Sequence, residues 1–243
     1  MYNKENYSTD TGKENLMNYT ISYLITCCNE TETLKNLLDK IVLSMGSNDE
    51  VVIVVDSGNY SIETNNIVNN YKKSFPEHIK VIYHDLNKNY GQHKNFGIEN
   101  CSKDWIFQLD GDELPPDSLT GKNLRILIDF NPTIELYWIP RMNNFIGVTD
   151  ADAVQWGWNI NNPNKLVNWN SGDYQGRLFK RDYPRIHWKN KLHEKIVGYT
   201  AYSFLPIDEE YALLHTKTIE TQRATNLRYN TEFSVQENQG HSE

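Results

Sequence analysis

Short apolar runs alternate with amphipathic segments along the first half of the chain. Four runs are apolar at nearly every position, namely 20–26, 51–55, 81–83 and 105–109. Such runs are typical of strands buried on both faces of a parallel sheet. The segments between them have helical character at 34–42, 67–71 and 92–100, and Asn29 with Glu32 is the expected cap of the first helix. The pattern predicts an α/β fold with a Rossmann-like, mostly parallel sheet, flanking helices and right-handed crossovers.

The pattern changes in the second half. Five of the six tryptophans lie between Trp138 and Trp188, among many Asn and Gly residues, and no clear helical periodicity precedes Gly176. Such a segment predicts a smaller mixed region of short strands and long functional loops. We expect one domain at 19–228, with halves at 19–112 and 113–228 and polar tails at 1–18 and 229–243.

Charge and composition exclude some classes of protein. The chain has 243 residues and a formal net charge of −8, from 24 Lys and Arg against 32 Asp and Glu. This balance argues against general binding to nucleic acid or to anionic lipid. Cys27, Cys28 and Cys101 form neither a CxxC pair nor an even disulfide framework, which favours a reducing compartment. With no signal peptide and no run of membrane-spanning length, a cytoplasmic protein is expected, with peripheral contact to a membrane left open.

Polar side chains follow three of the predicted strands. Asp110-Gly111-Asp112 closes the fourth run, Thr26 and the residues up to Glu30 end the first, and Asp56 ends the second. The carboxyl ends of parallel strands meet at one edge of a sheet, where ligands bind. Two carboxylates on a turn can approach one hard cation that also binds a diphosphate, whereas Asp-Gly and Asp-Ser-Gly are also common turn sequences.

The segment at 89–97, NYGQHKNFG, opens a predicted helix. It is neither a Walker loop nor a GxGxxG dinucleotide motif. Free backbone N–H groups near Gly91, together with Lys94, suit a phosphate or a carboxylate. A solvated surface position for Lys94 is the alternative.

Two histidine-containing segments complete the candidates. His193-Glu194 lacks the second histidine of a zinc protease, because position 197 is Val197. Glu194 is therefore either a surface residue or a general base beside a metal-diphosphate site. His215 follows a predicted strand, and from the residues alone it is either a metal ligand or a core histidine.

Taken in order, these segments resemble a known family. The segments are TISYLITCCNE, EVVIVVDSGN, NYGQHKNFG, DWIFQLDGDE, LYWIPRMNNFIG, DYQGRLFKR, NKLHEKIVG and LLHTK. Their order and spacing are similar to those of family 2 glycosyltransferases of GT-A fold, in the branch with lipopolysaccharide-core β-1,4-glucosyltransferase-like proteins. The resemblance spans about residues 19 to 228. It implies a GT-A fold with a nucleotide-sugar-binding half followed by an acceptor and catalytic half.

The resemblance also implies roles for individual residues. The expected donor-binding residues are Thr26, Asn29, Glu30, Asp56, Lys94, Asn95, Asp110 and Gly111. Asp112 and His215 are expected to hold a divalent cation, Mn²⁺ or Mg²⁺, and Glu194 to act as the base. The expected acceptor-side residues are Trp156, Trp158, Arg177, Trp188 and His193, although a tryptophan is more often a core or loop-anchoring residue than a platform for sugar rings. Two positions depart from the family pattern: Ser57-Gly58 follows Asp56 where Gly-Ser is commoner, and Lys94 stands where Arg is frequent.

The expected reaction is the metal-dependent, inverting transfer of a hexose from a nucleoside-diphosphate sugar to an acceptor hydroxyl. A UDP-sugar is the donor expected first. The acceptor is a glycan, a lipid-linked sugar or another hydroxyl compound. A sugar nucleotidyltransferase is one alternative, disfavoured because no Gly-rich, basic signature accompanies the first strand. A non-catalytic GT-A module that binds a sugar nucleotide or a glycan is the other.

Overall fold

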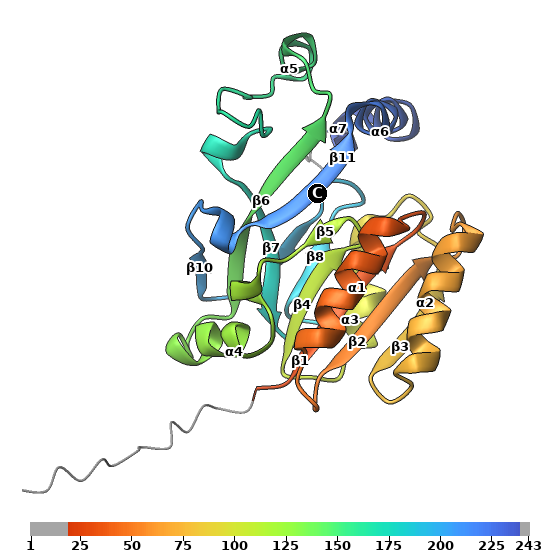
Figure 1. Ribbon diagram of the computed structural model, residues 1–243, viewed down its shortest axis with the longest axis vertical. Helices are drawn as coiled ribbons and strands as arrows, with labels where there is room; N and C mark the ends of the chain where they lie inside the picture. Colours follow the sequence, from red (N-terminus) through yellow and green to blue (C-terminus); the bar gives the residue numbers. More distant parts are fainter. Residues whose placement is uncertain (1–18, 239–243) are drawn as a thin grey trace, which may run out of the picture.

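A single large sheet forms the centre of the molecule. The computed structural model describes residues 19–238, in which strands and helices alternate through the first half (Figure 1). These elements are β1 (Ile21–Cys27), α1 (Glu32–Ser44), β2 (Glu50–Asp56), α2 (Ile62–Ser74), β3 (Ile79–His84), α3 (Tyr90–Glu99) and β4 (Trp105–Asp110). All four predicted strands and the three predicted helices are confirmed.

The first four strands are parallel, and β1, β2 and β4 are buried on both faces. The prediction of burial on both faces is wrong for the edge strand β3, where Lys80 and Tyr83 are exposed. β1 lies between β2 and β4, and β3 pairs with the outer edge of β2. Alternate side chains of these strands enter two different core clusters. On β1, for example, Ile25 packs with the leucines of α1, whereas Leu24 packs with Ile98 of α3. Helices α1 and α2 therefore cover one face and α3 covers the other (Figure 1), which explains why β1, β2 and β4 are apolar at nearly every position.

The second half extends the sheet with mixed strand directions. Its elements are β5 (Glu113–Leu114), α4 (Gly121–Phe130), β6 (Leu136–Ile146), α5 (Asp150–Trp156), β7 (Asp173–Lys180), β8 (His187–Lys189), β9 (Lys195–Val197), β10 (Tyr202–Phe204), β11 (Leu213–Thr218), α6 (Ile219–Glu232) and α7 (Val235–Asn238). Three 3₁₀ turns lie at Asp117–Leu119, Trp169–Ser171 and Glu209–Tyr211. The nine strands of the main sheet follow the order β3-β2-β1-β4-β7-β6-β11-β5, with β10 beside β6, while β8 and β9 form a separate hairpin.

Three expectations about the second half were incomplete. β6 has 11 residues rather than being short, and α5 lies inside the segment that has no evident helical periodicity. α5 is held by a capping box between Thr149 and Asp152 rather than by an apolar stripe. At the end of the chain, α6 continues past residue 228 and α7 follows it, so the polar composition after 228 does not mark the end of secondary structure. The expected tail at 1–18 and the last residues, 239–243, lie outside the described residues.

The starts of α1 and α3 show how local sequence sets helix boundaries. α1 begins at Glu32 with Thr31 in the capping position, so the cap predicted at Asn29 was placed too early. α3 begins at Tyr90, and the Asn89 side chain accepts a hydrogen bond from the Gln92 N–H at 3.0 Å. Asn89 therefore satisfies one of the free N–H groups at this helix end.

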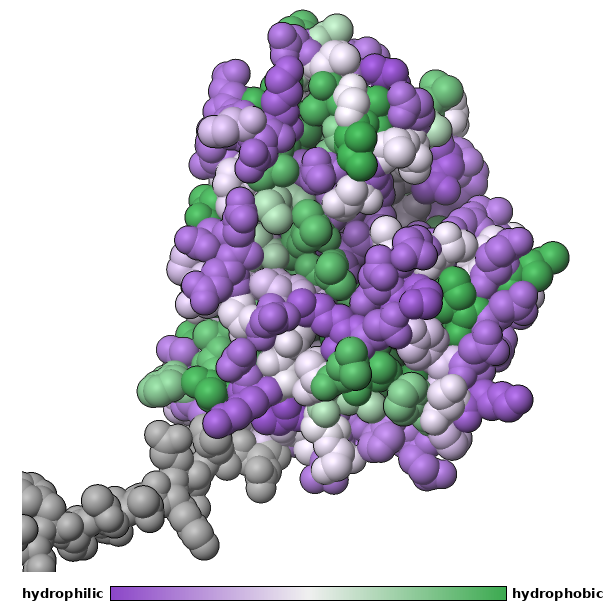
Figure 2. Space-filling model, viewed as in Figure 1, coloured by the Kyte–Doolittle hydropathy of each residue, from purple (hydrophilic) through white to green (hydrophobic). Residues whose placement is uncertain are grey.

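The surface agrees with the low hydropathy of the chain. Figure 2 shows hydrophilic residues over most of one face, with smaller groups of hydrophobic residues between them. Among residues 19–238, no helix is long and apolar enough to cross a membrane.

Candidate active site

Asp112 and His215 face each other across two neighbouring strands. β5 pairs antiparallel with β11, and His215 lies opposite Glu113, next to Asp112. This pairing brings His215 Nε2 within 3.3 Å of Asp112 Oδ2. The two residues predicted as metal ligands, 103 positions apart in the sequence, are thus in contact in the folded chain. Lys217, two residues further along β11, places Nζ 2.9 Å from the same oxygen.

The orientation of His215 is fixed by Asn143 of β6. The Asn143 amide nitrogen donates to Asp173 Oδ2 at 2.8 Å, so its amide oxygen is turned to His215 Nδ1 at 2.6 Å. Because that oxygen only accepts hydrogen bonds, Nδ1 carries the proton and the lone pair of the ring lies on Nε2. Burial lowers the pKa of His215 and outweighs the facing Asp112, so the ring is neutral at neutral pH.

This arrangement fits a divalent cation. A neutral Nε2 lone pair and a carboxylate oxygen face each other, and two acceptors in contact are stabilised by a positive charge between them. No group of three or more His, Cys, Asp and Glu side chains within residues 19–238 is arranged as a metal site. A cation held by Asp112 and His215 would therefore need further ligands from substrate oxygens or water.

Asp110 has a different environment from Asp112. Arg177 Nη2 lies 2.5 Å from Asp110 Oδ2, and Thr26 Oγ1 donates to Oδ1 at 2.9 Å. Burial raises the pKa of Asp110, but the charges of Arg177 and Lys94 outweigh it and hold the pKa well below its ordinary value. Asp110 is therefore an ionised carboxylate with a fixed orientation.

Arg177 was predicted on the acceptor side, and its position argues against that role. Its side chain is 1% exposed and lies beneath the site, where it also pairs with Glu113 at 2.6 Å and donates to Gln108 Oε1 at 2.7 Å. A guanidinium enclosed by these partners has no accessible surface that an acceptor could contact. Arg177 instead positions Asp110, which is a correction to the prediction.

Lys94 lies between Glu194 and Asp110. Its ammonium forms an ion pair with Glu194 Oε1 and lies 3.3 Å from Asp110 Oδ1, with only 4% of the side chain exposed. This buried position rules out the solvated surface charge for Lys94, and its partners are carboxylates, one of the two kinds of anion expected for it. Burial raises the pKa of Glu194, yet the attraction of Lys94 exceeds that effect and the net shift of the pKa is downward. Glu194 is thus a carboxylate whose Oε1 is paired with Lys94, and 16% of its side chain is exposed.

The start of α3 supports the loop that carries Glu194. The Tyr90 N–H donates to the Lys191 carbonyl at 2.8 Å. A Cβ on Gly91 would lie 2.4 Å from the Asn190 carbonyl oxygen, so only glycine permits this approach. The free amides expected to suit a phosphate are therefore used in part by protein groups, and Gly91 serves close packing.

The residues expected around the nucleoside gather at the ends of β1 and β2. Asp56 Oδ1 accepts from the N–H groups of Gly58 and Leu86, each at 3.0 Å, which confirms its turn contact and leaves Oδ2 beside the Cys28 thiol at 3.9 Å. Glu30 accepts from the Cys28 N–H at 2.6 Å, and burial with the nearby Asp112 raises the pKa of Glu30. Asn29 is exposed at the same edge.

Gly111 lies against the end of β1. Its N–H donates to the Thr26 carbonyl at 2.9 Å, and an added Cβ would lie 3.1 Å from Cβ of Cys27. Gly111 therefore keeps the two strand ends close together.

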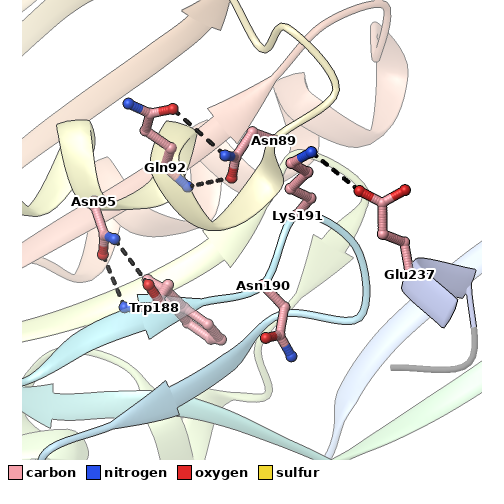
Figure 3. Close-up of a pocket in the computed structure, with 7 residues that line it drawn as sticks. All are labelled: Asn89, Gln92, Asn95, Trp188, Asn190, Lys191 and Glu237. Atoms are coloured by element: carbon pink, nitrogen blue, oxygen red, sulfur yellow. Dashed lines mark hydrogen bonds and ion pairs between the residues drawn. The ribbon is translucent and has the colours of Figure 1, made fainter. Parts of the chain in front are cut away.

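Asn95 and Trp188 hold the hairpin β8–β9 against α3. The Asn95 amide donates to the Trp188 carbonyl and accepts from the Trp188 N–H, both at 2.8 Å (Figure 3). Trp188 is 5% exposed, and Lys94 Nζ lies 4.8 Å from its ring centre. Both side chains are committed to internal contacts. The donor-binding role predicted for Asn95 and the acceptor platform predicted for Trp188 do not fit these positions.

A surface hollow of about 460 Å³ lies beside these two residues. Its lining is drawn in Figure 3 and consists of Asn89, Gln92, Asn95, Trp188, Asn190, Lys191 and Glu237. Lys191 and Glu237 form an ion pair of 3.1 Å across it. None of Asp56, Asp110, Asp112 and His215 lines this hollow, so it is separate from the carboxylate site.

The other residues expected on the acceptor side are more accessible. Trp156 and Trp158 are partly buried, with ring centres 4.7 Å apart, and pack on a small cluster that contains Phe145. His193 is exposed, has a positive φ of 52°, and its ring centre lies 6.3 Å from that of Tyr229. These three residues keep surface that an acceptor could contact.

Several residues of the site were missed from the sequence. Polar side chains occupy alternate positions of three inner strands and form one network beneath the site. They are Arg141 and Asn143 on β6, Asp173 and Gln175 on β7 with Arg177, and Lys217 on β11 with His215. The signal that could have found them is this period of two, which places polar residues on one face of a strand. Glu113 had no such signal, although its side chain is 0% exposed and pairs with both Arg177 and Arg141.

Comparison with known proteins shows which protein family the chain belongs to. The sequence profile of the family "Glycosyl transferase family 2" matches residues 22–209, and the chain belongs to this family. Its mostly parallel sheet with flanking helices is a GT-A fold, and the chain has a glycosyltransferase domain rather than that of a nucleotidyltransferase.

Individual relatives resemble parts of the chain. A stretch of 97 residues, 40% of this chain, is 30% identical to the poly-β-1,6-N-acetyl-D-glucosamine synthase of Staphylococcus epidermidis, of which it covers 23%. The crystal structure of TarS from S. aureus has the same fold, with a TM-score of 0.57 and 15% identity over 90% of this chain and 41% of that chain. A TarS structure in complex with UDP-GlcNAc gives a TM-score of 0.57 and 16% identity over 82% of this chain and 58% of that chain. The chain thus spans less than two thirds of each of these proteins.

Proposed function

We propose that the protein is a metal-dependent, inverting glycosyltransferase that moves a hexose from a UDP-sugar to an acceptor hydroxyl. The contact between Asp112 and the Nε2 lone pair of His215 carries this proposal, since it creates a place for a divalent cation at the edge of a GT-A sheet. A Mn²⁺ or Mg²⁺ ion bound there would offset the negative charge that develops on the leaving diphosphate. The complex of TarS with UDP-GlcNAc supports a uridine donor.

Residues at the ends of β1 and β2 would bind the nucleoside. Asp56 Oδ2 accepts only the weak hydrogen bond of the Cys28 thiol at 3.9 Å, so it would keep a lone pair for a base N–H. Asp110, Thr26 and Asn29 lie at the same edge and would contact the ribose and base. Glu30 would approach the diphosphate side, next to Asp112.

Glu194 would act as the general base. Lys94 holds Oε1, which leaves Oε2 to take the proton of the acceptor hydroxyl as its oxygen attacks the anomeric carbon. The bond between that carbon and the diphosphate oxygen breaks, and its electron pair leaves with the nucleoside diphosphate. Attack from the face opposite the leaving group inverts the anomeric configuration.

The acceptor would lie on the side of Trp156, Trp158 and His193, which retain accessible surface. The order and spacing of the sequence segments support the lipopolysaccharide-core glucosyltransferase-like branch, with a glycan or lipid-linked acceptor. The similarity to a poly-N-acetylglucosamine synthase supports N-acetylglucosamine as a second donor sugar to test. A cytoplasmic protein, at most peripheral to a membrane, is consistent with these acceptors.

A donor panel tests the proposal. Thermal unfolding and slow donor hydrolysis are measured with UDP-, GDP- and dTDP-sugars, each with Mn²⁺, with Mg²⁺ or with a chelator. We expect a stabilising shift with UDP-sugars that requires the metal, lost in Asp112→Asn and kept in the control Asp150→Asn, whose side chain is 89% exposed. A shift that survives chelation and Asp112→Asn would overturn the metal site, and the absence of any donor effect would overturn the function.

A further inference from the structure

Lys217 is the accessible cation at the carboxylate site. It lies two residues after His215 on β11, and because side chains alternate along a strand, both point to Asp112. Among residues 19–238, three Lys or Arg side chains pair with Asp110 or Asp112. Lys94 and Arg177 are 4% and 1% exposed, whereas the Lys217 side chain is 23% exposed.

Arg177, Lys94 and Lys217 differ in whether a second carboxylate pairs with them. Arg177 also binds Glu113, and Lys94 also binds Glu194, so both are fixed from two sides. Lys217 reaches Asp112 Oδ2 at 2.9 Å on a flexible four-carbon stem. The oxygen that it contacts is the same one that faces His215 Nε2.

A divalent cation and the Lys217 ammonium compete for this oxygen. A metal ion held by Asp112 Oδ2 would bring a second positive charge to the oxygen that Lys217 contacts, and the two like charges would repel at the edge of a protein core. Lys217 can relieve the repulsion by rotating its stem, which Lys94 and Arg177 cannot do. A diphosphate bound to the metal offers the displaced ammonium a new anionic partner at the same place.

We propose that Lys217 is a diphosphate-binding residue that neutralises Asp112 before the donor binds and moves to the donor phosphates when the metal takes its place. This inference rests on the proposed metal-dependent function. It makes metal and nucleotide binding cooperative: the metal alone must displace Lys217, whereas the metal with a nucleoside diphosphate gives Lys217 a better partner. By linkage, the nucleotide raises metal affinity by the same factor as the metal raises nucleotide affinity.

Removal of the Lys217 charge therefore has opposite effects on the two ligands. In Lys217→Met, Mn²⁺ alone binds about 5-fold or more tightly than in the wild type, whereas UDP in saturating Mn²⁺ binds about 5-fold or more weakly, which are magnitudes usual for coupled sites. Isothermal titration calorimetry with Mn²⁺ alone, and with UDP in Mn²⁺, measures both. Lys217→Arg keeps the charge and restores the wild-type coupling, and Lys72→Met, an exposed lysine of α2, changes neither affinity.

The outcomes separate this inference from the proposed function. Equal affinities in the wild type and Lys217→Met, with Mn²⁺ binding still abolished by Asp112→Asn, would overturn the role of Lys217 and leave the metal site standing. Weaker binding of Mn²⁺ alone in Lys217→Met would also overturn it, because that result makes the lysine a support for the metal rather than a competitor. A wild-type protein that binds neither Mn²⁺ nor UDP would overturn both proposals.

Discussion

The ammonium of Lys94 pairs with Glu194 Oε1 and at the same time lies 3.3 Å from Asp110 Oδ1. One buried cation thus joins the proposed base to the carboxylate assigned to the ribose side. The two carboxylates repel each other, and Lys94 offsets this repulsion. The position of Glu194 relative to the donor is therefore set by a residue 100 positions away in the sequence.

Replacement of Glu194 by Gln is expected to stop proton transfer while leaving the donor site in place. General-base assistance contributes about 10²–10⁴-fold in rate, so kcat should fall by about that factor. The Kd for UDP with Mn²⁺, measured by calorimetry, should stay close to that of the wild type. Near-normal turnover in Glu194→Gln would remove this residue from the role of base.

Replacement of Lys94 by Met is expected to shift the pH dependence of activity. Burial raises the pKa of Glu194 and Lys94 lowers it, so loss of the lysine leaves burial and Asp110 to raise this pKa above its ordinary value of 4.5. The acid limb of kcat/KM should therefore move to higher pH in Lys94→Met, which a pH-rate profile measures. An acid limb at the wild-type position would show that Lys94 does not control Glu194, and circular dichroism checks that the variant folds.

The ion pair between Lys94 and Glu194 also affects how the free energy of unfolding depends on pH. The pKa of Glu194 is lower in the folded chain than its ordinary value of 4.5, so its ionisation stabilises the folded state above pH 4.5. That contribution is lost as the pH falls through the folded pKa. In Lys94→Met the raised pKa of Glu194 reverses this dependence, so the unfolding free energy should no longer rise toward pH 4.5 and should instead fall as the pH rises through the raised pKa, which denaturant titration at several pH values measures.

Loss of Arg177 is expected to destabilise the fold. Arg177→Met removes the cation shared by Glu113, which is 0% exposed, and Asp110, and leaves them only the longer ion pairs with Arg141 at 3.4 Å and Lys94 at 3.3 Å, respectively. Breaking a buried ion pair from one side costs about 3–5 kcal/mol of unfolding free energy, which denaturant titration measures. The exposed Arg181, bonded to the Lys103 carbonyl at 2.7 Å, provides the matched control, and Arg181→Met should change stability by less than about 1 kcal/mol. Equal stability of the two variants would contradict a structural role for Arg177.

Asn143 is expected to control metal affinity through the tautomer of His215. Asn143→Leu removes the acceptor for the Nδ1 proton, and loss of such an outer contact typically weakens metal binding about 10–100-fold. Mn²⁺ titration measures the affinity, and ¹⁵N chemical shifts of His215 report the tautomer without any metal. The neighbouring amide in Asn144→Leu is the control. An unchanged tautomer in Asn143→Leu would contradict the role of Asn143.

The chain's apolar runs predicted much of the fold because they act locally. The burial of both faces of β1 and β2 is visible from their unbroken apolar sequences, and the spacing of Leu34, Leu37, Leu38 and Ile41 predicts one buried face of α1. The second half was harder to predict. α5 depends on a capping box, and β6 mixes polar and apolar positions because its polar side chains line the network under the site.

The sequence by itself determined the parallel sheet and the group of polar residues at its carboxyl edge, since strand burial and turn chemistry depend on near neighbours. Only the tertiary structure decided which polar groups are already engaged. Asn95 is used by Trp188, Arg177 by Asp110 and Glu113, and Lys94 by Glu194, while Asp112 meets His215 and Lys217. Hydrogen bonds and ion pairs between residues 64 to 105 positions apart leave no local pattern in a sequence. Their partners are set by strand order and register, which exist only once the sheet has formed.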